Sequence, residues 1–277
     1  MMPSVRIVTM LLALAVSISA PGCSLSSSSD SAKASPSTSS SAEATTEATG
    51  QPPAALPPPP PPAGIDWEVV GTSVQGQPLR VLTVGHGPRK VLFIGGIHGD
   101  EAEGSVAAAK LPEAFVAAGL SDAVTLTILE DANPDGRASG TRGNANGVDV
   151  NRNFPASNFN STDPSNGGQP LSEPEARVVV QTIDRIAPNL VVVAHSWVGR
   201  QFINFDGPAR EIADRFSVSS GMPVEESSSF APTPGSLGSY FGRDRGIPIL
   251  TIEVRRGTDP TAVWDQLREA LLQAIRG

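Results

Sequence analysis

A histidine and a glutamate stand three residues apart in the segment GGIHGDE. They are His98 and Glu101, and the apolar residues 91–94 before them are expected to form a strand that ends in this glycine-rich turn. An imidazole and a carboxylate at this spacing can bind one divalent metal ion together. The same pattern also arises where a histidine caps a helix and a glutamate faces water. The segment therefore predicts a metallohydrolase on condition that further ligands are found.

The chain has three histidines, so the search for another imidazole ligand is short. His86 lies in the turn sequence GHGP between two strand-like runs and is interpreted as a solvated hairpin residue. His195 follows the run 189–194, which is apolar after its first residue and typical of a buried strand. It is either a structural histidine or the third member of a His/Glu/His zinc site. Such a site leaves one position open for water.

A third strand-like run, residues 249–254, carries a single carboxylate at Glu253. Burying an unpaired carboxylate is costly. Glu253 is therefore either an edge-strand residue that points at water or a general base in a cleft. Three strand ends would bring Glu253 near His98 and His195, at the carboxyl edge where open α/β sheets place their sites.

Further motifs follow one another between residues 91 and 254. After GGIHGDE come NPDG at 133–136, TR at 141–142, GVDVNRNFP at 147–155, SEPE at 172–175, HS at 195–196 and IE at 252–253. In this order they resemble the zinc carboxypeptidases of the carboxypeptidase A fold. The resemblance rests on several independent matches in the correct order, and HxxE alone would not support it.

The resemblance implies a role for each matching residue. One zinc ion per chain would be bound by three side chains: His98, Glu101 and His195. Glu253 would act as the general base that activates the attacking water, and Arg142 would stabilise the oxyanion.

By the same resemblance, Asn151 and Arg152 would hold the terminal carboxylate of the substrate. The chemistry agrees, because a guanidinium offers a fixed fork of donors that matches two carboxylate oxygens and stays charged at any working pH. Asp135 in NPDG is interpreted as a structural turn residue. Residues 147–149 are interpreted as scaffolding for Asn151 and Arg152.

The loop before the last apolar run departs from the digestive members of this family. Those enzymes have a mobile tyrosine there, and Phe230 stands near its expected place. The segment TPGSLGSY at 233–240 and the short GTRGNANGVDVNRNFP spacing resemble instead the murein-peptide amidase branch. Its members cut the bond between γ-D-glutamate and meso-diaminopimelate in cell-wall peptides. Leu237 would then lie in the pocket for the leaving residue, where no acidic side chain is evident to bind a second ammonium group.

Two other functions remain open. One is an acyl-amino-acid deacylase of the succinylglutamate desuccinylase type, which shares HGDE-type ligands; NRNFP and TPGSLGSY argue against it. The other is a non-catalytic lipoprotein that binds wall peptides. The presence of Glu253 beside a complete ligand set argues against this, because a binding protein needs no base.

The N-terminus indicates export. Residues 7–20 are apolar, with the length of a signal-peptide core and too short for an ordinary transmembrane helix. APGC at 20–23 resembles a bacterial lipobox, so residues 1–22 are expected to be a lipoprotein signal peptide and Cys23 the lipidated first residue of the mature chain. Cleavage near Ala20 and an uncleaved anchor are the alternatives. Cys23 is the only cysteine, so no intramolecular disulfide can form.

The rest of the chain divides by composition. Residues 23–64 contain Ser, Ala, Thr and Pro with almost no large apolar side chain, which predicts a disordered tether. Residues 65–277 have the length of one ordinary domain. The formal net charge of -8 becomes -9 without residues 1–22, which contain one arginine and no acid. No basic patch with interleaved aromatics occurs, which argues against a nucleic-acid partner. A small peptide and, through the lipid anchor, a membrane are the expected partners, while the oligomeric state stays open.

Strand-like and helical segments alternate in residues 65–277. Strands are expected at residues 79–84, 91–94, 124–129, 189–194, 201–205 and 249–254. Helices are expected at 101–118, 173–186 behind a Ser172/Glu175 capping box, 208–217, 236–243 and 260–275. This alternation predicts a three-layer α/β/α fold. The mixed, mostly parallel order of its central sheet is implied by the resemblance.

Overall fold

A seven-stranded mixed sheet organises the computed structural model, which describes residues 66–229 and 233–277. The strands are β1 (Glu68–Thr72), β2 (Pro78–Val84), β3 (Arg89–Ile94), β4 (Val124–Leu129), β5 (Leu190–Trp197), β6 (Phe202–Asp206) and β7 (Ile249–Arg255). The α-helices are α1 (Val106–Ala117), α2 (Pro134–Ser139), α3 (Pro174–Ile186), α4 (Arg210–Ser220) and α5 (Pro260–Arg276). The sheet order is β1-β2-β4-β3-β5-β7-β6.

The centre of the sheet is parallel and its edges are antiparallel. β3 pairs in parallel with both β4 and β5, and β5 pairs in parallel with β7. β2 and β6 add to this centre in the antiparallel sense, and β1 pairs antiparallel with β2. Parallel strands are buried on both faces, which explains why the central strands are nearly continuous apolar runs.

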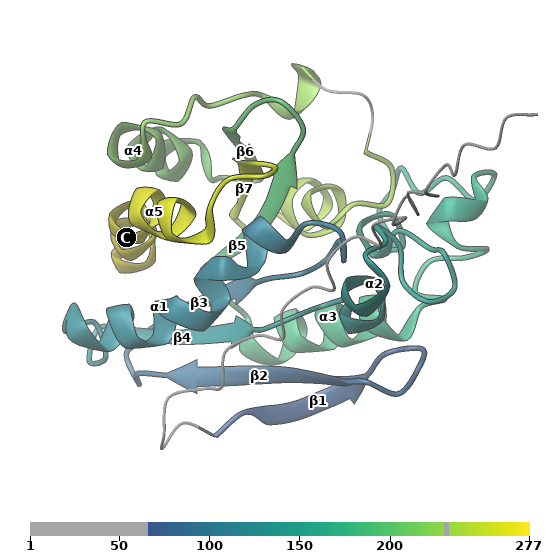
Figure 1. Cartoon of the computed structure of the whole chain (residues 1–277), viewed down its shortest axis with the longest axis horizontal. Coiled ribbons are helices and arrows are strands. Elements are labelled where there is room, and N and C mark those ends of the chain that lie inside the picture. The colour runs from purple at the N-terminus through teal and green to yellow at the C-terminus, as the bar shows by residue number, and fades with distance from the viewer. Residues whose placement is uncertain (1–65, 230–232) are drawn as a thin grey trace, which may run out of the picture. The chain divides into compact units, whose positions relative to one another are not determined.

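Successive side chains of β3 point to opposite faces of the sheet and belong to two different core layers. Val91 and Phe93 belong to the layer that includes α1, α4 and α5. Leu92 and Ile94 belong to the layer that includes α3. In Figure 1, α4, α5 and α1 follow one another along one side of the sheet. The predicted three-layer α/β/α fold is therefore confirmed.

The two edge strands differ in how they end the sheet. In β1 the pairing register shifts between Val69 and Gly71, which marks a bulge. A Cβ atom on Gly71 would lie 2.4 Å from a methyl carbon of Val178 in α3, so this strand packs closely on the helix. On the other edge, Ile203 of β6 forms one isolated parallel bridge with Val224.

Several helix boundaries differ from those expected. The segment expected at 101–118 begins with the 3₁₀ turn η1 (Ala102–Ser105) before α1, and the one expected at 236–243 is a π-helix, η5 (Gly238–Asp244). The helix expected at 208–217 is shifted to α4. Within residues 66–229 and 233–277, the helices include none with the length and apolar character needed to span a bilayer.

The expected capping box of α3 is absent. Glu173 occupies the N-cap position and makes no capping hydrogen bond with its side chain. The Ser172 hydroxyl donates to Glu173, at 2.8 Å, and not to the helix backbone. Glu175 is fully buried and accepts a hydrogen bond from the backbone of Val74 at 3.0 Å. Its burial in a tertiary contact explains why it does not reach back to the helix start.

His86 is exposed, as expected, but it does not lie in a hairpin. The strands on either side of it, β2 and β3, are separated in the sheet by β4. The turn therefore belongs to a connection that passes β4, and the hairpin interpretation was wrong. Its imidazole Nε2 lies 3.2 Å from a carboxylate oxygen of Asp122, and both side chains face solvent.

Candidate metal and catalytic site

The structure brings the three predicted metal ligands together. His98 and Glu101 lie in the turn after β3, and His195 lies in the adjacent strand β5. One ligand atom from each residue lies within 4.8 Å of the others. All three side chains are buried, with 3 to 5% of each exposed. They therefore lie where one ion could contact all of them.

The donor atoms of these residues fit a zinc ion. Nδ1 of His98 is buried without a hydrogen-bond partner, although it lies 3.0 Å from Oε1 of Glu101. Nδ1 of His195 lies 2.9 Å from the other oxygen, Oε2. Two imidazole nitrogens and a carboxylate are a common protein ligand set of zinc. An ion between them would also give the unpartnered nitrogen a partner.

Asp149 orients His98 through its second ring nitrogen. The Asp149 carboxylate lies 3.0 Å from Nε2 of His98. If Nε2 carries the proton and donates it here, Nδ1 is left free to bind a metal. Burial opposes ionisation of Asp149, but His98 and Arg142 outweigh burial and hold the pKa of this carboxyl well below its usual range. The sequence treated Asp149 as scaffolding, and its direct contact with a ligand was missed.

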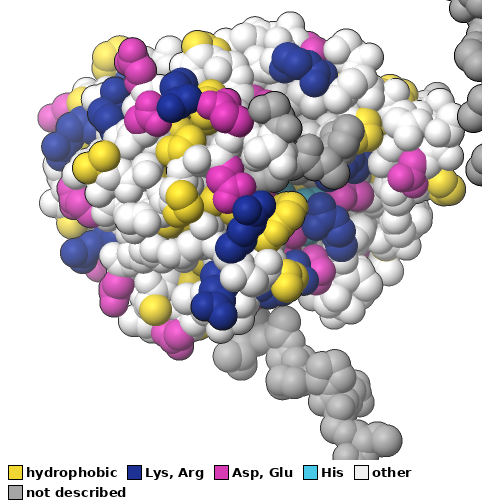
Figure 2. All heavy atoms as spheres, turned by 90° about the horizontal axis from the view of Figure 1, so that it is seen from above, with side chains coloured by type: hydrophobic (Ala, Val, Ile, Leu, Met, Phe, Trp, Pro, Cys, Tyr) yellow, Lys and Arg dark blue, Asp and Glu magenta, His cyan; other side chains and the backbone are white. Residues whose placement is uncertain are grey.

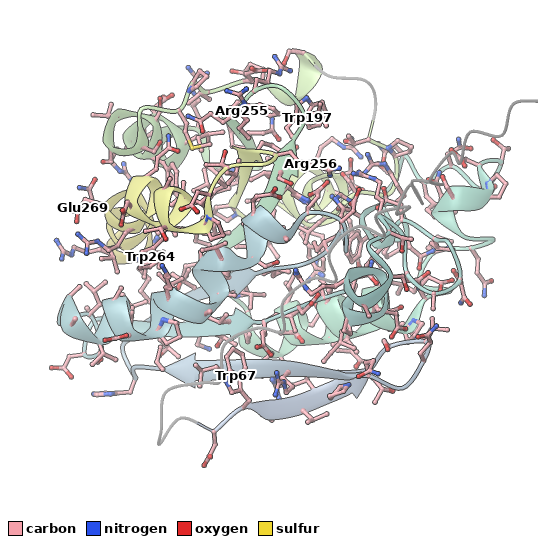
Figure 3. All side chains as sticks on the ribbon, viewed as in Figure 1. Trp67, Trp197, Arg255, Arg256, Trp264 and Glu269 are labelled. Atoms are coloured by element: carbon pink, nitrogen blue, oxygen red, sulfur yellow. The ribbon has the colours of Figure 1, made fainter. Side chains whose placement is uncertain are left out.

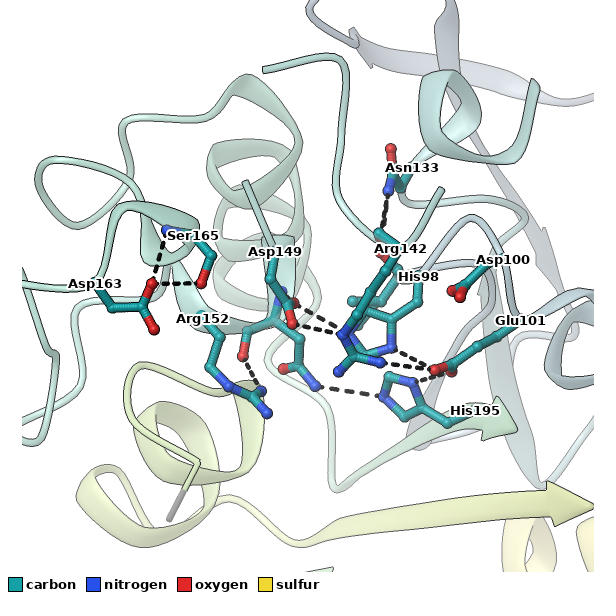
Figure 4. Close-up of polar contacts among 12 residues, drawn as sticks. His98, Asp100, Glu101, Asn133, Arg142, Asp149, Arg152, Asp163, Ser165 and His195 are labelled. Carbon is teal, nitrogen blue, oxygen red and sulfur yellow. Dashed lines mark hydrogen bonds and ion pairs between the residues drawn. The ribbon is translucent and has the colours of Figure 1, made fainter. Parts of the chain in front are cut away.

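Arg142 connects this carboxylate with the ligand set. Its Nη1 donates to Oε1 of Glu101 at 3.0 Å, and its Nε donates to Oδ2 of Asp149 at 2.9 Å. Figure 4 shows these contacts beside the two histidines. Burial alone would lower the pKa of Arg142. The nearby carboxylates of Asp149 and Glu101 outweigh burial, so the pKa of the guanidinium lies above its usual value. The guanidinium therefore stays charged and can stabilise negative charge that develops on an oxygen.

Glu253 lies beside His195 in the sheet. The register of β5 and β7 pairs these two residues, and directly paired residues point to the same face. β7 lies between β5 and β6, so Glu253 is not on an edge strand and that alternative was wrong. The residue is 9% exposed, and its burial raises the pKa of the carboxyl to about 7. Such a group can accept a proton and return it near neutral pH.

The three candidate ligands line one cavity of about 590 Å³ together with Arg142 and Glu253. In Figure 2 a histidine is visible in a hollow of the surface, with basic side chains around it. Asn151 and Arg152 belong to the lining, as does Leu237, which is only 1% exposed. The cavity therefore joins the candidate ligands to the residues that the sequence placed around a substrate.

Asn151 and Arg152 are fixed by contacts with the loops around them. The Asn151 side-chain oxygen accepts a hydrogen bond from the backbone N–H of Leu237 at 2.9 Å. Its side-chain nitrogen lies 3.4 Å from Nε2 of His195. Nη1 of Arg152 donates to the carbonyl of Asn151 at 2.8 Å, which leaves other guanidinium donors for a ligand. Burial lowers the pKa of Arg152.

Sequence reasoning missed Asp206, which lines the same cavity at the end of β6. Its carboxylate accepts a weak hydrogen bond of 3.3 Å from the Ser227 hydroxyl, and burial raises its pKa. A Cβ atom on Gly238 would lie 2.0 Å from this carboxylate, so the glycine leaves room for it. An acidic side chain thus faces the cavity, contrary to expectation. An acid at the end of the strand-like run FINF was the available signal.

Asp135 has the structural role expected of it. Its carboxylate accepts hydrogen bonds from the Ser73 hydroxyl at 2.7 Å and from the backbone of Gln75 at 2.9 Å. These contacts fasten α2 to the turn between β1 and β2. Phe230 and Cys23, together with residues 1–22 and 23–64, lie outside the described residues.

Comparisons with known proteins agree with this geometry. The zinc carboxypeptidase family matches residues 62–215. Murein peptide amidase A of Escherichia coli (strain K12) is 31% identical over 203 residues, which cover 67% of this chain and 80% of that protein.

Solved structures agree as well. The crystal structure of murein-tripeptide amidase from Escherichia coli O157 has a TM-score of 0.61 and 27% identity, and the match covers 79% of this chain and 93% of that one. Bovine thrombin-activatable fibrinolysis inhibitor has a TM-score of 0.63 at 19% identity, covers 76% of this chain and 88% of that one, and supports the fold alone.

Proposed function

Because the chain belongs to the zinc carboxypeptidase family and is a hydrolase, we propose that it removes C-terminal meso-diaminopimelate from cell-wall peptides. The proposal draws on its similarity to murein peptide amidases and on the side chains around its cavity. The scissile bond would be the amide between the γ-carboxyl of D-glutamate and the diamino acid.

The observation that carries the proposal is that Arg152 and Asp206 line the same cavity. Meso-diaminopimelate has a carboxylate beside the leaving amine, and it has an ammonium group at its far end. A guanidinium suits the carboxylate, and a carboxylate suits the ammonium group. Asp206 forms no ion pair among the described residues, although the positive charge of Arg243 is near enough to lower its pKa. Besides the weak contact with Ser227, its carboxylate is therefore available to a substrate.

Each side chain of the candidate site would have its own role in hydrolysis. A zinc ion bound by His98, Glu101 and His195 would act as a Lewis acid on the scissile carbonyl. Glu253 would take a proton from the attacking water, whose oxygen bonds to the carbonyl carbon, and would return that proton to the leaving amine. Arg142 would donate hydrogen bonds to the oxyanion that forms.

Asn151 and Arg152 would set the direction of cleavage. By binding the free carboxylate of the leaving residue, they would hold the scissile bond beside Glu253 and Arg142. Contacts of this kind help both substrate binding and the transition state. The enzyme would therefore release one terminal residue and would not cut within a longer peptide.

The test uses L-alanyl-γ-D-glutamyl-meso-diaminopimelate, with mass spectrometry of the products. We expect cleavage at the γ-glutamyl bond. Amidating the carboxylate next to the leaving amine should lower kcat/KM by at least about tenfold, the scale of one lost contact. Arg152→Ala should remove most of this difference. Equal rates on both peptides with the native enzyme would indicate an internal endopeptidase or a deacylase instead.

A second substrate pair tests Asp206. The leaving residue is either meso-diaminopimelate or 2-aminopimelate, which lacks the distal amino group. The native enzyme should prefer the first by about tenfold or more, and Asp206→Asn should lose that preference. Asp122→Asn, an exposed change beside His86, serves as the control and should keep it. A preference that survives in Asp206→Asn would show that another group recognises the ammonium.

The proposed location is the extracytoplasmic side of a membrane. The support is the sequence of residues 1–64, with its signal-like core, its lipobox-like APGC and its Ser/Ala/Pro-rich stretch. Cys23 would carry the lipid, and the stretch after it would hold the catalytic domain away from the bilayer.

A further inference from the structure

A third arginine, besides Arg142 and Arg152, lines the cavity, and it follows the last residue of β7. Arg256 lines the cavity, and Figure 3 shows it near Trp197. Its backbone N–H donates to the carbonyl of Trp197 at 2.9 Å, which ties the ends of β7 and β5 together. Its Nη1 donates to Asp100 at 3.1 Å, and its Nη2 lies 3.5 Å from Oε1 of Glu101. The guanidinium is therefore held next to the candidate metal ligands.

The position of Asp100 shows which side of the site Arg256 occupies. In the view of Figure 4, Arg152 lies on one side of His98 and His195, and Asp100 lies on the other side with Glu101. Since Arg256 is hydrogen-bonded to Asp100, its guanidinium is on the side away from Arg152. If Arg152 marks the leaving residue, the Asp100 side receives the acyl part of the substrate.

The guanidinium of Arg256 has N–H donors that make no hydrogen bond among the described residues. An arginine carries five N–H donors, and one hydrogen bond of this side chain, to Asp100, occurs among the described residues. Its Nε is buried without a partner, as is Oδ1 of Asp100. The side chain is 34% exposed, so the rest of the fork can be reached from the cavity. This arrangement suits an arginine that completes its contacts when an anion binds.

We propose that Arg256 is a specificity-determining residue that binds a free carboxylate on the acyl side of the scissile bond. The inference rests on the proposed function. When D-glutamate is linked through its γ-carboxyl, its α-carboxylate stays free a few bonds from the reacting carbonyl. An ordinary α-linked peptide has no backbone carboxylate at that place. Arg256 would thus favour γ-glutamyl peptides over α-linked ones.

The experiment compares two peptides that differ only in this carboxylate. They are L-alanyl-γ-D-glutamyl-meso-diaminopimelate and the analogue in which the glutamyl α-carboxylate is an amide. For the zinc-loaded full-length protein we expect kcat/KM to be about tenfold or more higher on the free carboxylate, the effect of one charge-assisted contact. In Arg256→Met this ratio should fall to about one. Arg256→Lys should keep part of it, because the positive charge remains.

Two further measurements separate recognition from a structural role. Arg255→Met changes the exposed neighbour, which does not line the cavity, and should keep the full ratio. Zinc content of each variant is measured by elemental analysis. If Arg256 only fastens Asp100 and Glu101, Arg256→Met will lose zinc or lower the rates on both peptides equally, and the proposal is overturned. Equal rates by the native enzyme overturn it too, while leaving the proposed function standing. No cleavage of either peptide contradicts the proposed function itself.

Discussion

At the scale of single residues, burial determines what Glu253 can do. The carboxyl is 9% exposed, and its pKa of about 7 lets it exchange a proton near neutral pH. Glu253→Gln keeps the shape of the side chain and removes the titrating group. We expect this variant to bind zinc and to lose about 10²- to 10⁴-fold in kcat. Near-normal turnover in a folded, zinc-loaded variant would exclude Glu253 from the mechanism.

The raised pKa of Glu253 also predicts how stability varies with pH in the metal-free protein. The folded state holds this proton more tightly than the unfolded chain, whose carboxyl ionises near 4.5. Ionisation therefore costs stability in the folded state. The contribution of Glu253 is most favourable below about pH 4.5 and is lost as the pH rises through about 7. Each pKa unit is worth about 1.4 kcal/mol, so the loss is at most about 3 to 4 kcal/mol for a shift from 4.5 to about 7.

Urea unfolding in the presence of a chelator measures this effect. The free energy of unfolding is compared between the native protein and Glu253→Gln at several pH values. The native protein should lose stability relative to the variant as the pH rises. A constant difference between the two would contradict the prediction.

Asp149 gives a prediction for the binding of zinc. Its carboxylate contacts His98 with one oxygen and Arg142 with the other. Asp149→Asn removes the charge that orients both, and loss of such a supporting contact typically lowers metal affinity by about 10- to 100-fold. Chelator competition measures the affinity. Asp163→Asn, an exposed carboxylate that caps a 3₁₀ turn, is the control. Unchanged affinity in Asp149→Asn would exclude the orienting role.

At the scale of elements, the turn η1 packs against the end of β5 that carries His195. A Cβ atom on Gly104 would lie 2.6 Å from the carbonyl oxygen of Ala194 and 2.9 Å from the backbone nitrogen of His195. Because backbone atoms would have to move, Gly104→Ala should cost about 1–3 kcal/mol and weaken zinc binding. The melting temperature should fall by about 2–4 °C for each kcal/mol. Gly168→Ala is the control, since a Cβ there meets nothing within 4 Å. Equal melting temperatures would contradict this packing argument.

The elements that the sequence predicted well are those that are buried on both faces. The expected strands at residues 91–94, 124–129 and 249–254 correspond to β3, β4 and β7, because parallel central strands are continuous apolar runs. β1 was missed because it is a short edge strand with exposed residues and a glycine. α2 was missed because its sequence PDGRAS contains proline and glycine, which normally disfavour helices.

The grouping of the candidate residues was predictable where residue type and a strand end coincide, as at His98, His195 and Glu253. Asp149 was not assigned its contact with His98 because it caps a 3₁₀ turn and does not follow a strand, so no local pattern places it beside a ligand. Asp206 was not assigned to the site because its place in the cavity depends on β6 pairing with β7 at the edge of the sheet. Contacts of this kind depend on strand order, which local patterns do not encode.

At the scale of the whole molecule, the proposed lipid anchor and tether predict that anchoring and catalysis can be separated. Cys23→Ser should give an active enzyme that moves to the soluble fraction, because the lipid would anchor the chain and take no part in the site. Cell fractionation with an activity assay on each fraction checks this. Continued membrane association of the variant would show that the signal segment itself remains as the anchor.

The two edge strands of the sheet, β1 and β6, affect whether copies of this protein aggregate at high concentration. An open strand edge is a template on which a neighbouring chain can add a strand and start aggregation. The bulge between Val69 and Gly71 interrupts that template on β1. On β6, Ile203 already exchanges backbone hydrogen bonds with the segment around Val224. Neither edge offers a long, regular row of free backbone groups, so we expect the folded protein to resist edge-to-edge aggregation at high local concentration.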